Sequence, residues 1–179
     1  MCSLLLTKKL LHGVVFLMIY IIIAILVFIG DIISKYIAEQ NLVHVRTIPL
    51  IENVFHLTYV ENRGMAFGMF SGGRVLFIIV SVVVLVLLIM LFKKTEISAR
   101  TVWQKAGTAL IFSGALGNLV ERISKGYVVD FLDFTLIDFP VFNIADIAVC
   151  VGAGMLVIHF LLAERKDGKN ALKGEKNNG

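Results

Sequence analysis

Two long stretches of the chain are apolar at almost every position. No charged residue occurs from Gly13 to Gly30, and only Ser81 interrupts the apolar run from Val75 to Phe92. A helix that crosses the hydrocarbon core of a membrane needs about 20 mostly apolar residues. Both stretches are therefore predicted to form membrane-spanning helices.

Two further stretches are apolar but contain polar residues. Asn143 and Asp146 lie within the first of them, and Gly and Ser residues interrupt the second. Small residues allow helices to approach closely in lipid. We therefore predict a membrane α-helical fold with four transmembrane helices, which cover about residues 13–35, 75–92, 103–120 and 141–163.

The segment between the first two predicted spans has a different pattern. From Phe55 to Val60 apolar and polar residues alternate, which is typical of a half-buried β-strand. Residues 43–45 and 48–51 are candidates for a second strand, and Pro49 favours a position at the sheet edge. We expect a small extracytoplasmic β-sheet within residues 36–74.

The composition agrees with a membrane protein. Hydrophobic residues make up 58% of the chain and charged residues 17%, whereas a soluble domain contains about 25% charged residues. This excess excludes a soluble globular enzyme, a disordered chain and a disulfide-stabilised scaffold.

The cations indicate the orientation of the predicted helices. The predicted spans place eleven cations on the same side of the membrane, namely Lys8, Lys9, Lys93, Lys94, Arg100, Lys105, Arg165, Lys166, Lys169, Lys173 and Lys176. The positive-inside rule places this side, and with it both termini, in the cytoplasm. The net charge of +4 is thus explained by topology, and no nucleic-acid partner is expected. Residues 1–163 are predicted to form a single integral-membrane domain, followed by a cytoplasmic polar tail at 164–179.

The acidic residues are the candidates for catalysis. Asp146 lies within the fourth apolar stretch, where a carboxylate costs about 2.5–3.5 kcal/mol at mid-bilayer, and Asn143 shares its helix face. Other acids, among them Asp130 and Glu121, precede it near the same outer ends of the spans. Two neighbouring carboxylates share a proton, and such a pair can activate water and protonate a leaving group.

Other interpretations of these acids stay open on the residues alone. Asp146 could pair with Arg122 to hold two helices together, or several acids could bind a metal ion. At the level of function, intramembrane acids also form proton relays. The alternatives to an enzyme are therefore a small proton-coupled membrane transporter and a membrane scaffold.

Five short motifs occur in order along the chain, and together they resemble a known family. They are Asp31-x-x-x-Lys35, Asn62-Arg63-Gly64-Met65-Ala66-Phe67, Gly114-Ala115-Leu116-Gly117-Asn118-Leu119-Val120-Glu121-Arg122, Val128-Val129-Asp130-Phe131 and Phe142-Asn143-Ile144-Ala145-Asp146. This series, over about residues 13–163, is similar to bacterial lipoprotein signal peptidase, also called signal peptidase II.

The resemblance implies a specific activity. The family is an aspartic endopeptidase of the bacterial cytoplasmic (inner) membrane. It removes signal peptides from prolipoproteins by cutting before a diacylglyceryl-modified cysteine at the outer face. The implied partners are these prolipoproteins and membrane lipids, and no cofactor or metal is implied.

The resemblance also implies roles for individual residues. Asp130 and Asp146 match the catalytic pair, and which of them acts as the base is left open. Asp31 and Lys35 match a structural pair that closes the first helix. Residues that match substrate-binding or site-bracing positions are Asn62, Gly64, Asn118, Arg122 and Asn143.

Two features complete these expectations. Glu121 stands where the family motif usually has aspartate, which indicates that this acid braces the site while Asp130 carries the chemistry, because a displacement of about 1 Å can cost about 100-fold in rate. The segment after Asn62 is rich in glycine, at Gly64, Gly68, Gly72 and Gly73. It could form a mobile cover over the site or an ordinary turn after a strand.

Overall fold

The computed structural model describes residues 2–64, 73–96 and 101–177. This part of the chain contains four α-helices, three β-strands and one short 3-10 helix. In order they are α1 (Cys2–Leu42), β1 (Thr47–Ile51), β2 (Phe55–Asn62), α2 (Arg74–Lys94), α3 (Val102–Ser124), β3 (Val128–Asp133), η1 (Thr135–Ile137) and α4 (Ile144–Asn177).

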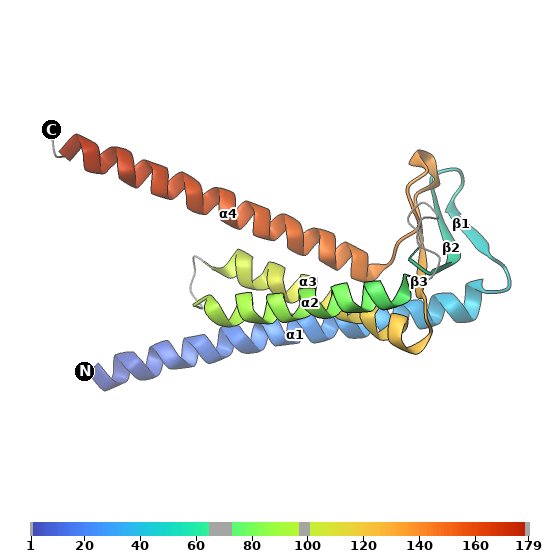
Figure 1. Ribbon diagram of the computed structural model, residues 1–179, viewed down its shortest axis with the longest axis horizontal. Helices are drawn as coiled ribbons and strands as arrows, with labels where there is room; N and C mark the ends of the chain where they lie inside the picture. The colour runs from blue at the N-terminus through green and yellow to red at the C-terminus, as the bar shows by residue number, and fades with distance from the viewer. Residues whose placement is uncertain (1, 65–72, 97–100, 178–179) are drawn as a thin grey trace.

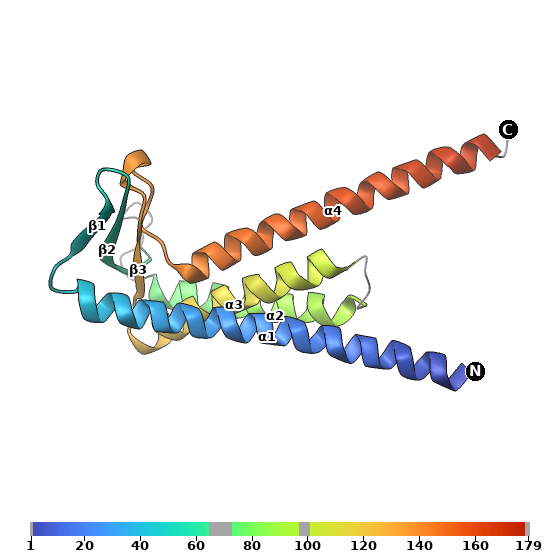
Figure 2. The ribbon, with the colours of Figure 1, turned by 180° about the vertical axis from the view of Figure 1, so that it is seen from behind.

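The helices run along one another and the sheet lies at one end of them (Figure 1). The start of α1 and the end of α4 lie at the opposite end, as do the end of α2 and the start of α3. Seen from behind, α4 begins close to the other helices beside the sheet and diverges from them toward its C-terminal end (Figure 2). The fold therefore has the sheet at one end, and at the other end α1 begins and α4 ends.

Within the described residues, three segments are long and apolar enough to cross a membrane, namely Gly13–Leu42, Arg74–Lys94 and Ile144–Glu164. The fourth predicted span is helical in α3, but α3 is less apolar and is not among these candidates. Buried polar residues along α3, such as Thr108, Ser113 and Asn118, explain the difference.

The helix α3 lies in contact with all three other helices. Glycines permit the close approach of α4, because a side-chain carbon on Gly107 would lie 2.6 Å from the carbonyl oxygen of Gly152. A side-chain carbon on Gly114 would overlap the carbonyl oxygen of Ala145. The small residues of α3 therefore bring its polar face against the first turn of α4.

The three strands form one antiparallel sheet in the order β1-β2-β3. The predicted strand at residues 55–60 is confirmed within β2, and Pro49 lies in the edge strand β1, as expected. The third strand, β3, follows α3 in the sequence and was not predicted. Residues 43–45 were wrongly considered as strand, because α1 continues to Leu42 and a turn follows it.

The ends of the first and last helices also differ from expectation. Asp31 and Lys35 do not close α1, because the helix runs on to Leu42 and both side chains are buried inside the molecule. The helix α4 continues to Asn177, through the polar residues that were predicted as a tail.

A small apolar cluster joins the end of α1 to the sheet. Ala38 and Leu42 of α1 pack against Tyr59 of β2 and against Val129 and Phe131 of β3. Alternate residues of a strand point to opposite faces. Because the two neighbours of Asp130 enter this cluster, its own carboxylate is directed to the other side of β3.

Candidate active site

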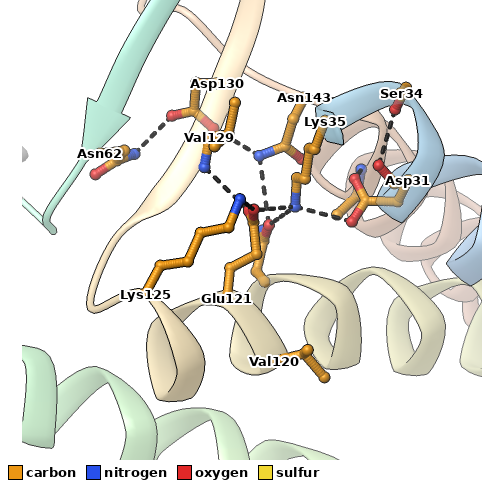
Figure 3. A network of polar contacts seen from close by, with 12 residues as sticks. Asp31, Ser34, Lys35, Asn62, Val120, Glu121, Lys125, Val129, Asp130 and Asn143 are labelled. Atoms are coloured by element: carbon orange, nitrogen blue, oxygen red, sulfur yellow. Dashed lines mark hydrogen bonds and ion pairs between the residues drawn. The ribbon is translucent and has the colours of Figure 1, made fainter. Parts of the chain in front are cut away.

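The carboxylate of Asp130 is buried and held by two amides. Its side chain comes from β3 and the residue is 2% exposed. Its Oδ2 accepts a hydrogen bond from Asn62 Nδ2 at 2.8 Å, and its Oδ1 accepts one from Asn143 Nδ2 at 2.6 Å (Figure 3). Both oxygens therefore have neutral donors, and no described cation donates a hydrogen bond to either of them.

The second carboxylate, Asp146, lies in the first turn of α4 and forms a reciprocal cap with Asn143. The Asn143 backbone N–H donates to Asp146 Oδ2 at 3.1 Å, and the Asp146 N–H donates to Asn143 Oδ1 at 3.0 Å. This is the pattern of a capping box, with aspartate in place of glutamate. A carboxylate is also favoured here by the positive end of the helix dipole.

Asn143 connects the two carboxylates. Its side-chain oxygen binds the Asp146 amide, while its Nδ2 donates to Asp130 and, at 3.3 Å, to Asn118 Oδ1. Asn118 of α3 completes the ring by donating its Nδ2 to Asp146 Oδ1 at 2.9 Å. The folded chain thus unites two acids from β3 and α4 around one fully buried asparagine.

A group of buried ions lies directly beside these amides. Lys35 Nζ donates to Asp31 Oδ2 at 2.8 Å and to Asn118 Oδ1 at 2.7 Å, and it lies 3.4 Å from Glu121 Oε2. The side chain of Lys35 is 1% exposed, and it extends from α1 into the network (Figure 3). The lysine therefore balances two acids and orients the amide that holds Asp146.

Asp31 also fixes α1 to the beginning of α4. Its Oδ1 accepts a hydrogen bond from the Ala145 backbone N–H at 2.9 Å. Its Oδ2 lies so close to Gly117 that a side-chain carbon there would overlap it. The glycine in α3 is therefore required by the space that this carboxylate occupies.

Glu121 holds the backbone next to Asp130. Its Oε2 accepts a hydrogen bond from the Val129 N–H at 3.0 Å, and its Oε1 lies 3.0 Å from Lys125 Nζ. The same lysine reaches Glu39 of α1 at 2.6 Å. These contacts connect α1, α3 and the start of β3, and they are consistent with the bracing role expected for Glu121.

The two acids face open space. One cavity of about 480 Å³ is lined by Asp130 together with Asn62, Arg63, Gly64, Phe77 and Arg122, among others. A second, of about 490 Å³, is lined by both Asp130 and Asp146 and continues along α4 past Ile147, Cys150 and Val151. Because Asn62, Asp130, Pro140 and Val141 line both, the cavities adjoin at Asp130.

Burial raises the pKa of Asp130 to about 6. The negative charge of Asp146 also raises it, whereas the hydrogen bonds from Asn62 and Asn143 act in the opposite direction. Loss of hydration disfavours the charged carboxylate more than the amides stabilise it. This carboxyl therefore gains and loses its proton near neutral pH, which suits a group that transfers protons.

The charges of Arg122 and Asp146 interact, but the direct ion pair that one sequence interpretation suggested is not formed among the described residues. Asn118 and Asn143 hold the Asp146 carboxylate instead. The Arg122 guanidinium lies 5.5 Å from the centre of the Phe77 ring and lines the cavity at Asp130.

Gly64 ends the described part of the segment after β2. It has a φ of 85°, and its N–H donates to Asn62 Oδ1 at 2.9 Å. This turn orients the amide that binds Asp130. Met65, Ala66, Phe67, Gly68 and Gly72 lie outside the described residues, so the alternatives of a cover and a turn stay predictions.

Sequence reasoning missed two supports of the site. One is the hydrogen bond from Ala145 to Asp31, and the other is that from Val129 to Glu121. Both have backbone N–H donors, which every residue type except proline provides, so the sequence does not reveal them. The Asn-x-x-Asp spacing at 143–146 is a capping signal that could have shown where α4 begins. In residues 2–64, 73–96 and 101–177, no three His, Cys, Asp or Glu side chains gather as a metal site would require.

Comparisons with known proteins agree on one family. Residues 23–162 match the family described as Signal peptidase (SPase) II. The lipoprotein signal peptidase of Clostridioides difficile (strain 630) is 48% identical over 151 residues, or 83% of this chain and 99% of the relative. That of Halothermothrix orenii is 43% identical over 148 residues, or 83% and 98%. A solved bacterial membrane enzyme aligns with a TM-score of 0.71 at 33% identity, covering 79% of this chain and 92% of that one.

Proposed function

The chain belongs to the signal peptidase II family, and from this we propose that it is an aspartic endopeptidase that acts on diacylglyceryl-modified prolipoproteins. It removes the signal peptide by cutting immediately before the lipid-modified cysteine. The observation that carries the proposal is the pair Asp130 and Asp146, which Asn143 links and which line one cavity. The comparisons give no support to the transporter alternative.

The two acids divide the proton transfers. Asp130, whose pKa is raised to about 6, is the member that holds the shared proton. Asp146, as carboxylate, takes a proton from water while the water oxygen attacks the scissile carbonyl carbon, and Asp130 protonates the carbonyl oxygen. The tetrahedral intermediate then collapses: Asp146 gives its proton to the leaving amine nitrogen, the C–N bond breaks, and Asp130 recovers its proton from the hydroxyl.

Residues around the pair keep it in position. Asn118 and Asn143 orient the Asp146 carboxylate, and Asn62 holds that of Asp130. Arg122 and Gly64 line the cavity on the other side of Asp130, where they bind or brace the peptide. Asp31, Lys35 and Glu121 support the site without touching the substrate.

The cavity wall beyond Asp146 suits the lipid of the substrate. Ile147 and Val151 follow Asp146 along α4 and present apolar side chains to the same cavity. A diacylglyceryl group placed there brings the peptide bond before its cysteine to the two acids. The wall therefore supports recognition of a lipid-modified cysteine.

The orientation proposed for the chain follows from its cations. Lys93, Lys94 and Lys105 lie at the end of the helices opposite the sheet, where α1 begins and α4 ends (Figure 1). By the positive-inside rule this end is cytoplasmic. The protein is thus a multi-pass protein of the bacterial inner membrane with both termini inside and its active site toward the outer face.

The polar helix α3 completes the membrane arrangement that we propose. It crosses as the fourth span because α1, α2 and α4 each pack against it and shield its polar face from lipid. Residues 1–163 then form one integral-membrane domain, and residues 164–179 extend into the cytoplasm as a polar segment.

Cleavage of a defined substrate tests the proposal. The purified chain is incubated in detergent micelles with a diacylglyceryl-modified prolipoprotein peptide, and the products are identified by mass spectrometry. Asp130→Asn and Asp146→Asn are expected to lower the rate by about 10²–10⁴-fold, the range for loss of a general acid or base. Asp138→Asn is the matched control, since Asp138 is exposed and its positive φ of 49° is also tolerated by asparagine.

Three results would overturn the proposal. Cleavage at the wild-type rate by either variant would show that the missing carboxylate is not catalytic. A cut elsewhere than before the modified cysteine would contradict the proposed position. Proton-dependent ion flux without proteolysis would favour the transporter.

A further inference from the structure

A third cavity lies away from the acids, between α1 and α2. Both helices pack along α3, but within the described residues α1 and α2 make few close contacts with each other. The space between them forms an apolar groove of about 330 Å³, within the size range of small-molecule sites. Ala24 of α1 and Ala109 of α3 belong to its lining and keep it deep, because their side chains are small.

The groove is separate from the proposed active site. On α1 it is lined from Tyr20 to Ile25, and Asp31 lies about 9 Å further along the helix at 1.5 Å per residue. No residue that lines the two cavities at Asp130 also lines this groove. An occupant of the groove would therefore leave the two acids accessible.

The shape and lining of the groove fit one hydrocarbon chain. Its accessible wall is apolar, and it opens between Ile21, Ile25 and Ile89, each of which is more than a third exposed. At the end near the helix termini, the rings of Tyr20 and Phe92 meet edge to face at 6.0 Å. A chain that enters from the surrounding lipid is thus enclosed by three helices along its length.

The positive charge of the lysines at that end of the groove favours a lipid with an anionic head group. Lys93 lines the groove and Lys94 follows it, both exposed in the last turn of α2. Lys105 of α3 lies 3.9 Å from the centre of the Phe92 ring and donates to the Phe92 carbonyl oxygen. In the part of the chain that the structure describes, no carboxylate forms an ion pair with these lysines.

We propose that the groove between α1 and α2 binds one anionic phospholipid, with an acyl chain between the helices and its phosphate at Lys93. The lipid is a resident of the leaflet at the end of the helices where both termini lie. It fills the space that α1 and α2 leave open and fastens them to α3. This site is independent of the lipid carried by a prolipoprotein.

Native mass spectrometry of the purified full chain tests the site. Phosphatidylglycerol and phosphatidylcholine with identical acyl chains are titrated separately, and bound lipids are counted. One phosphatidylglycerol is expected to bind more tightly than phosphatidylcholine. Lys93→Gln should weaken phosphatidylglycerol about fivefold, the contribution of one interfacial cation, and should weaken phosphatidylcholine less, because the choline cation offsets the charge of its phosphate. Lys94→Gln, whose residue does not line the groove, should have a smaller effect.

A larger side chain inside the groove provides a second test of the site. Ala24→Phe places a ring in the groove and should remove the bound lipid. Ala153→Phe makes the same exchange at an exposed position of α4 outside the groove, and it should leave binding unchanged. Equal affinity for the two lipids, equal effects of the two lysine changes, or full binding by Ala24→Phe would each overturn the proposal. If Ala24→Phe fails to fold by circular dichroism, the lysine pair decides.

Discussion

Two halves of one buried network hold their carboxylates in different ways. In the ion-paired half, Asp31 and Glu121 lie beside Lys35, and Glu121 also pairs with Lys125. In the amide-held half, Asp130 and Asp146 accept hydrogen bonds from the side chains of Asn62, Asn118 and Asn143 and from a backbone N–H. Asn118 belongs to both, because it accepts from Lys35 and donates to Asp146.

This difference indicates which acids support the fold and which perform the chemistry. A buried acid beside a lysine has its charge balanced, and removal of either partner leaves an uncompensated charge. A buried acid held by neutral amides has no cation in direct contact among the described residues, and burial raises the pKa of Asp130 to about 6, although the more distant charge of Lys35 lowers it in part. Such perturbed groups occur where a protein performs proton transfer. The ion-paired half should therefore matter for stability, and the amide-held half for catalysis.

The largest expected effect on stability is the removal of the central cation. Lys35→Met leaves Asp31 and Glu121 buried without it, and should lower the free energy of unfolding by about 3–5 kcal/mol. Lys125→Met is the control, because Lys125 shares the partner Glu121 but its side chain is 31% exposed. The control should cost about 1 kcal/mol or less. Chemical denaturation in micelles measures both, and equal losses would contradict the comparison.

The amide-held half should show the opposite sign. The pKa of Asp130 in the folded protein, about 6, exceeds the ordinary value of 3.8. Its contribution to stability is therefore complete below about pH 4 and is lost as the pH rises through 6. Between these limits Asp130→Asn should gain up to about 3 kcal/mol relative to the natural chain. Unfolding measured across this pH range checks the gain, and two parallel curves would refute it.

Glu121 tests how the first half positions the second. Glu121→Asp shortens the side chain that binds the Val129 N–H. A displacement of Asp130 by about 1 Å should reduce kcat by up to about 100-fold with little change in KM. Glu121→Gln keeps an acceptor oxygen for Val129 and should retain more of kcat. Greater activity in Glu121→Asp than in Glu121→Gln would show that charge, and not reach, is what the site needs.

The smallest effect is expected for a cation outside both halves. Arg74 is exposed and donates to the carbonyl oxygens of Arg122 and Ile123 near the end of α3. Arg74→Gln should cost about 1 kcal/mol of stability, as for loss of favourable contacts at a helix C-terminus, and leave kcat unchanged. A loss as large as that of Lys35→Met would mean that the end of α3 depends on this contact.

Hydrophobic pattern predicted the helices well, because long apolar runs have few alternative structures. The strand β3 was missed because Val128 and Val129 form too short a run to distinguish a strand from other structures. The chemistry of Asp130 and Asp146 was suggested by their motifs and their location. The role of Lys35 was not, since a lysine four residues after an aspartate looks the same at a helix end as in a buried network. Only folding shows that it reaches Asn118 on another helix.

The central claim is that the amide-held acids serve catalysis and not stability. It is tested most directly by measuring melting temperature and cleavage rate together for Asp146→Asn, with Asp31→Asn as the matched exchange in the ion-paired half. The account predicts that Asp146→Asn melts close to the natural chain and does not cleave the lipid-modified peptide, while Asp31→Asn melts lower and keeps the activity of its folded fraction. Full cleavage by Asp146→Asn, or loss of its fold without any loss in Asp31→Asn, would contradict the account.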